Sequence, residues 1–200
     1  MQKEIEAKFL NQNHDEIRKK LLELGAKCVH ANKLMHRTTM DYPDRSLQSK
    51  GSWIRLREEL SGDIELILKQ VKDSKSIDGV FETAVGVSDY EKAKQFLLSI
   101  GLQIKSEQES KREVWELDGV EIMLDEWPWV PTYIEIEAGT EEKVKDVASK
   151  LGLNWSDAVF GAVTPVYATH YGISGPEFES LEISMRFNDS PPEQLTKYSK

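Results

Sequence analysis

The chain has 200 residues, which is enough for one domain with a buried core and cramped for two. Hydrophobic residues make up 39% and charged residues 30%, and no apolar run approaches the roughly 18 residues of a membrane-spanning helix, so we expect no membrane partner. The formal net charge of -9 argues against a nucleic-acid partner, because nucleic-acid binders normally present a basic surface.

Cysteine usage and the N-terminus bear on the compartment. Cys28 is the only cysteine, so the chain forms no intrachain disulfide and has no second thiolate for a metal site. The N-terminus enters a strand-like segment without the basic and apolar regions of a signal peptide. We therefore expect a cytoplasmic protein. The sequence does not distinguish a monomer from a homodimer.

The first strand-like segment puts three charges on one face. Glu4, Glu6 and Lys8 alternate with apolar residues up to Phe9. Successive side chains of a strand point to opposite faces, so the two carboxylates and the ammonium share one side. Such a face suits a metal ion and an anion. A second segment repeats the pattern near residue 135.

Helical spacing of apolar residues predicts three helices, over residues 13–25, 88–101 and 141–151, and a short one near 157–160. The first two open with a capping residue followed three positions later by glutamate, and each closes at a glycine. These signals are typical of helix ends.

Alternating polar and apolar residues predict further strands. Asp118-Gly119 separates two of them and indicates a tight hairpin. From residue 175 the chain becomes polar, so we expect a domain over residues 1–174 and a loosely attached tail over 175–200, in which 181–185 could form a short strand. The expected strands cover residues 53–57, 64–69, 80–85, 113–117, 120–125 and 133–138.

Charge recurs on one face of six or seven of these strands, with apolar residues on the other. A single such alternation is also typical of a solvated sheet, but its repetition favours strands that enclose a polar interior. We therefore predict an α+β fold: an eight-stranded antiparallel closed barrel, or tunnel, with a polar interior and helices packed outside. The charged face collects Glu4, Glu6, Lys8, Arg55, Arg57, Glu65, Lys69, Glu82, Arg112, Asp125, Glu135 and Glu137.

These residues resemble the CYTH superfamily, also called triphosphate tunnel metalloenzymes. The resemblance rests on an ExExK signature at Glu4 to Lys8, the segment 36–58, the tripeptide ILK at 67–69, and LDEW followed by YIEIEA, and it covers residues 1 to about 155. It implies an eight-stranded antiparallel tunnel that hydrolyses or cyclises triphosphate-bearing substrates with a divalent metal.

The resemblance also assigns roles to residues. Mg2+ or Mn2+ is the expected cofactor, and the implied metal residues are Glu4, Glu6, Asp125, Glu135 and Glu137. The residues implied to bind the triphosphate are Lys8, Arg37, Arg55, Arg57, Lys69 and Arg112. The family often has two basic residues near 112, but here Ser110 takes the earlier place, and Lys111 points outward if the strand is regular.

Three functions stay open at this point. The first is a metal-dependent hydrolase of tripolyphosphate, nucleoside triphosphate or thiamine triphosphate, in which Glu82 or Glu65 orients the attacking water. The second is a class IV adenylate cyclase, and the third is a non-catalytic polyphosphate-binding module. A Walker-type site is excluded because no GK[ST] loop is present. Trp127 and Trp129 suit a lid or a base-stacking platform, although packing is the more common role of such residues.

Overall fold

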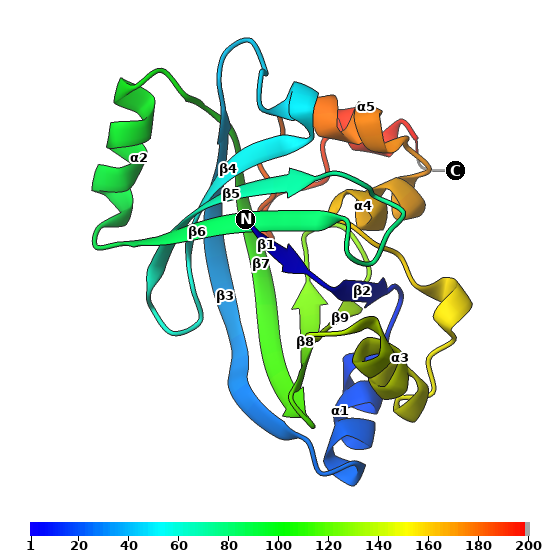
Figure 1. The fold of residues 1–200 in the computed structure, drawn as a ribbon. Coiled ribbons are helices and arrows are strands. Elements are labelled where there is room, and N and C mark those ends of the chain that lie inside the picture. The colour runs from blue at the N-terminus through cyan, green and yellow to red at the C-terminus, as the bar shows by residue number, and fades with distance from the viewer. Residues whose placement is uncertain (199–200) are drawn as a thin grey trace.

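A computed structural model describes residues 1–198. Its strands form one antiparallel sheet that curls into a nearly closed barrel, in the order β1-β6-β5-β4-β3-β7-β8-β9-β2 (Figure 1). The strands are β1 (Gln2–Glu4), β2 (Glu6–Phe9), β3 (Lys27–Asp41), β4 (Ser52–Glu58), β5 (Ile64–Val71), β6 (Val80–Val87), β7 (Gln103–Leu117), β8 (Val120–Glu126) and β9 (Tyr133–Glu137).

The barrel is closed by the N-terminal segment. This segment changes neighbours at Ile5, because β1 pairs with β6 and β2 pairs with β9. At the break, the Glu6 amide donates to the carbonyl of Ile77 and the Ala138 amide donates to the carbonyl of Ile5. The predicted barrel is therefore confirmed, and the ninth strand arises because one predicted N-terminal strand is divided in two.

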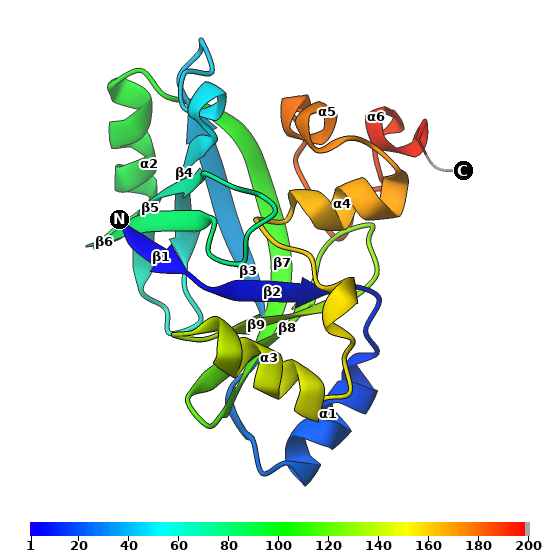
Figure 2. The same ribbon diagram turned by 45° about the vertical axis from the view of Figure 1, so that its right-hand side comes forward.

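Helices surround the barrel (Figure 2). The Asn13 side chain caps the first of them by accepting from two backbone amides, and Gly25 ends it with a φ of 78°, which glycine adopts without strain. No helix within residues 1–198 is both long and apolar enough to cross a membrane. The helices are α1 (His14–Glu23), α2 (Tyr90–Ser99), α3 (Glu141–Lys150), α4 (Thr164–Tyr171), α5 (Gly175–Ser180) and α6 (Glu193–Thr196).

The apolar faces of the strands turn outward, as predicted. Phe9, Ile122 and Ile136 pack with Ile17 of α1 and Val144 of α3 in one buried cluster. A smaller cluster lies under α2, which contacts β4 and β7. Because both clusters lie outside the barrel, the inward positions are left to polar side chains.

Two long strands differ from the prediction. β3 runs over 15 residues and was not among the expected strands. It pairs along its length with β7, of which only residues 113–117 were predicted. Their missed parts lack the apolar alternation of an ordinary half-buried strand, because one face lines the polar interior and much of residues 27–34 is exposed. The short helix expected near 157–160 is a 3-10 turn over Trp155–Asp157.

The segment after residue 174 packs on the barrel, although we expected a loosely attached tail. Phe178, Ile183, Met185 and Leu195 are buried in a third cluster with Tyr167 of α4. Met185 exchanges backbone hydrogen bonds with β7, at Glu107 and Glu109, instead of lying in the short strand considered for residues 181–185. The short apolar alternation over residues 181–185 does not by itself indicate a partner on the barrel.

Candidate active site

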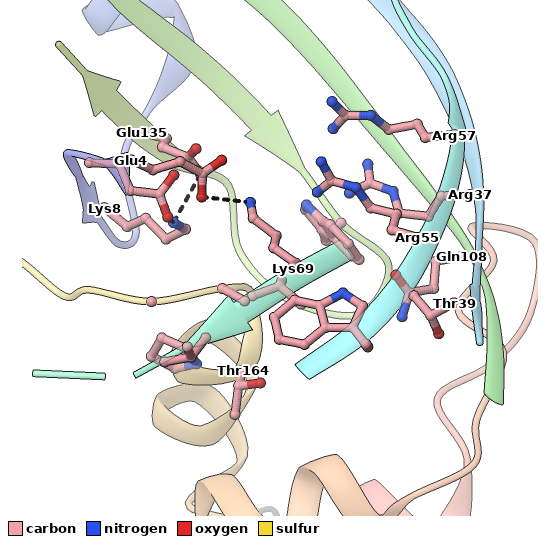
Figure 3. A pocket seen from close by; sticks show the side chains of 18 of the residues that line it. Glu4, Lys8, Arg37, Thr39, Arg55, Arg57, Lys69, Gln108, Glu135 and Thr164 are labelled. Atoms are coloured by element: carbon pink, nitrogen blue, oxygen red, sulfur yellow. Dashed lines mark hydrogen bonds and ion pairs between the residues drawn. The ribbon is translucent and has the colours of Figure 1, made fainter. Parts of the chain in front are cut away.

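The barrel encloses a cavity of about 1110 Å3, and each of its strands contributes lining residues. Charged side chains from opposite walls face one another across it. Figure 3 shows Glu4, Lys8 and Glu135 on one side and Arg37, Arg55 and Arg57 on the other. The cavity is therefore a polar tunnel with an acidic wall and a basic wall.

Three glutamates converge on the acidic wall. One carboxylate oxygen from each of Glu6, Glu135 and Glu137 lies within 4.8 Å of the other two. The register explains this, because Glu6 stands opposite Glu137 in the β2–β9 pair and Glu135 is two residues away on the same face. Lys8 stands opposite Glu135, and its Nζ lies 2.8 Å from a Glu6 oxygen and 3.1 Å from a Glu135 oxygen.

Burial and mutual repulsion perturb these carboxyl groups. Burial, with the nearby Glu135, raises the pKa of Glu6 to about 8, and the same two causes raise the pKa of Glu137 to about 7. Burial acts against ionisation of Glu135 as well, but Lys8 and Arg112 outweigh it and hold the pKa of Glu135 well below its usual range. The negative charge of the cluster is therefore only partly neutralised by the protein.

This donor set fits a divalent cation. Clustered carboxylate oxygens are the ligands that Mg2+ and Mn2+ prefer, and a dication would remove the repulsion that raises the pKa values of Glu6 and Glu137. Glu6, Glu135 and Glu137 are therefore the residues that would hold it. Glu4 and Asp125, which the resemblance also implied, lie outside this cluster.

Both excluded carboxylates are occupied by other partners. Asp125 is almost completely buried and accepts from Nε and Nη2 of Arg112 at 2.7 and 2.6 Å, so its two oxygens hold that guanidinium. Glu4 lies 2.9 Å from Nζ of Lys69. Both carboxylates thus lie against basic side chains in the structure, and their predicted role as metal ligands stays a prediction.

Glu82 and Glu65 were the candidates for orienting water. Glu82 lines the cavity, and its carboxylate is 3.8 Å from Arg55 and 3.9 Å from Lys69. Burial, with the neighbouring Glu4, raises its pKa. Glu65 is absent from the cavity lining within residues 1–198 and lies four residues along β5 from Lys69, which is about 13 Å for an extended strand. The geometry favours Glu82.

The basic wall comes from β3 and β4. Arg37 stands opposite Arg57, and Arg55 stands opposite Thr39. The Nε atoms of Arg37 and Arg55 are buried without a hydrogen-bond partner in the part of the chain that the structure describes. Burial and Arg57 lower the pKa of Arg55 to about 10. Unpaired buried donors of this kind indicate an anion-binding site, since burial without a partner is unfavourable.

Ser110 has a role that the sequence did not reveal. Its hydroxyl accepts from Nη2 of Arg37, so the small residue on β7 makes room for a guanidinium from β3. Lys111 lies outside, where it pairs with Glu126 at 3.4 Å, as a regular strand predicts. Gln108 also lines the cavity. Ser110 and Gln108 lie two and four residues before Arg112 on β7, so the strand period of two would have placed both on the inner face.

The comparisons with known proteins give the family. The CYTH domain model matches residues 2–156. The chain belongs to the CYTH domain family. The resemblance seen in the sequence is therefore confirmed. No curated protein matches the sequence.

Solved structures share the CYTH fold at low sequence identity. The PH1012 protein of Pyrococcus horikoshii is 22% identical over 82% of this chain and 98% of its own, with a TM-score of 0.68. A protein of Vibrio parahaemolyticus, provisionally described as an adenylate cyclase, is 19% identical over 84% and 98%, with a TM-score of 0.71. The Hippeastrum protein HpAC1, provisionally an adenylyl cyclase and described as having a dominant triphosphatase activity, is 16% identical over 84% and 96%, with a TM-score of 0.58.

Proposed function

We propose that this CYTH protein is a divalent-metal-dependent triphosphatase. The observation that carries the proposal is the pairing, inside one cavity, of a carboxylate cluster with arginine N–H groups that have no protein partner. Phosphoryl transfer requires a protein mainly to position the substrate and to neutralise charge on its oxygens, and these two walls supply both functions.

In this mechanism the basic residues bind the polyphosphate chain. The arginines donate to nonbridging oxygens, and their planar guanidinium groups suit phosphate oxygens better than point charges do. Asp125 fixes the orientation of Arg112, and Glu4 fixes Lys69. The basic residues with this proposed role are Lys8, Arg37, Arg55, Arg57, Lys69 and Arg112.

The acidic residues act at the phosphate group that is hydrolysed. Glu6, Glu135 and Glu137 would hold the divalent ion, which would supply Lewis-acid stabilisation of charge on the phosphate oxygens. Glu82 accepts a proton from the attacking water, because its raised pKa makes it a stronger base than an ordinary carboxylate. Lys8, held between Glu6 and Glu135, keeps both carboxylates in place.

Two other functions remain as alternatives. A class IV adenylate cyclase would need the ribose 3'-hydroxyl next to the α-phosphate, and the cavity continues from the arginines to the apolar residues Phe178 and Met185, where an organic group has room. The description of HpAC1 favours hydrolysis. A non-catalytic module is disfavoured because binding an anion does not require the glutamate cluster, which would repel it.

The test is a product analysis. The purified protein is incubated with tripolyphosphate, ATP or thiamine triphosphate, each with Mg2+, Mn2+ or EDTA, and the products are separated. Metal-dependent release of phosphate supports the triphosphatase, whereas cyclic AMP and pyrophosphate would identify the cyclase. Binding without turnover would leave only the module. Glu6→Gln should abolish turnover, and Glu126→Gln on the outer face of β8 is the matched control.

A further inference from the structure

Arg37 differs from the other arginines of the tunnel because no carboxylate pairs with it in the described residues. Arg55 faces Glu82, Arg57 pairs with Glu59 and Arg112 pairs with Asp125. Arg37 is buried, and its one side-chain hydrogen bond goes to the neutral hydroxyl of Ser110. Something other than an ion pair must hold its guanidinium in place.

The arginines around it make this position unfavourable. Arg37 stands directly opposite Arg57 in the β3–β4 pair, and like charges in opposite positions of a sheet destabilise it. Burial lowers the pKa of Arg37 well below its usual range, and Arg57, Arg55 and Arg112 lower it further. An unsupported Arg37 side chain would move away from these charges.

The indole ring of Trp127 supplies the support. The guanidinium carbon of Arg37 lies over the ring, 4.5 Å from its centroid, and Trp127 is itself buried. A cation over an indole face is attracted by the ring electrons, most strongly when water is excluded. The contact leaves the Nε donor of Arg37 without a hydrogen-bond partner among the described residues, while Nη2 donates to Ser110.

Trp127 is in turn held by residues beyond the matched family domain, which ends at residue 156. Tyr167 of α4 meets Trp127 edge to face at 6.5 Å and stacks on Phe178 of α5 at 4.7 Å. The Tyr167 hydroxyl also donates to the carbonyl of Pro128 at 2.8 Å, which fixes the loop that carries the tryptophan.

We propose that Trp127 is a positioning residue for triphosphate binding. Trp127 holds the Arg37 side chain close to the neighbouring arginines, with the Arg37 N–H groups directed toward the substrate oxygens. The segment from α4 to α5 keeps Trp127 in place. This inference rests on the proposed function, since it concerns the same tunnel. It makes residues after 156 part of the phosphate-binding apparatus and extends their role beyond packing.

The test is a double-mutant cycle read by binding of inorganic tripolyphosphate in EDTA, where no turnover occurs. Trp127→Leu should weaken binding about 10-fold or more, in line with the strength of a desolvated cation–π contact, and Trp127→Phe should restore part of the loss. In an Arg37→Ala background, Trp127→Leu should cause no further loss. Trp129→Leu is the matched control, because Trp129 packs on the same cluster without contacting Arg37.

Each outcome decides a different point. If wild-type protein binds tripolyphosphate neither in EDTA nor with Mg2+, the proposed function itself fails. Two results with a wild-type protein that binds would refute the positioning role and leave the function standing. In the first, Trp127→Leu binds tripolyphosphate normally. In the second, the losses of affinity caused by Trp127→Leu and Arg37→Ala are independent and multiply in the double variant. If Trp127→Leu does not fold, the NMR resonance of the Arg37 Nε–H is compared between wild type and Trp127→Phe instead. A ring-current shift that differs between the two supports the contact, and identical resonances refute it.

Discussion

Replacing Glu6 by glutamine should stabilise the metal-free protein while it removes metal binding. In the metal-free fold the pKa of Glu6 is about 8, whereas the ordinary value is 4.5. At pH 7 this carboxyl group is ionised in the unfolded chain and mostly protonated in the fold, so folding must take up a proton, which destabilises the fold by roughly 2.5 pKa units, or about 3 kcal/mol. Glutamine is isosteric and uncharged, so it removes this term and can still accept a hydrogen bond from Lys8.

The assay is thermal unfolding in EDTA and in Mg2+, with Glu126→Gln as control. A gain of 3 kcal/mol corresponds to a rise in Tm of about 6 to 12 °C for a chain of this length. Because the folded-state pKa of Glu6 is raised, its contribution favours folding most below pH 4.5 and is lost as the pH rises toward 8. In EDTA the variant should lack this loss. A variant that is less stable than wild type in EDTA, yet still gains stability from Mg2+, would refute the reasoning.

Three further predictions follow from the contacts of single side chains. Asp125→Asn should release Arg112 and so weaken tripolyphosphate binding about 10-fold in calorimetry, while the number of metal ions bound stays the same. Loss of metal binding in this variant would show that Asp125 is a metal ligand. Arg57→Ala should raise KM in a hydrolysis assay at least 10-fold with a smaller change in kcat, whereas an unchanged KM would remove it from the substrate site. Phe178→Ala should destabilise the protein by about 3 kcal/mol in urea unfolding, and a neutral effect would mean that the segment after residue 174 is loosely attached.

The sequence predicted the inward and outward faces of the barrel but not the partners within it. Alternation places Glu6, Glu135 and Asp125 on the inner face, because the side-chain period of a strand is two. It does not say that Asp125 stands opposite Arg112, which depends on the register between β7 and β8. The division of the acidic residues into metal-binding and arginine-binding groups is therefore a tertiary property.

The C-terminal contribution was out of reach for a related reason. Leu181, Ile183 and Met185 alternate with polar residues as in a strand, but this short alternation does not name a partner, and their burial arises only when the segment meets β7 and α4. The support of Arg37 by Trp127 joins positions 90 residues apart in the sequence. No local pattern encodes such a contact, whereas the ends of α1 and α2 are encoded locally and were predicted correctly within a residue or two.

The most direct test of the central claim is a crystal structure with tripolyphosphate and Mn2+, in which anomalous scattering locates the metal. The account predicts a manganese peak between Glu6, Glu135 and Glu137 and phosphate oxygens within hydrogen-bonding distance of Arg37 and Arg55. A metal outside the glutamate cluster, or an anion bound on the outer surface of the barrel, would contradict it.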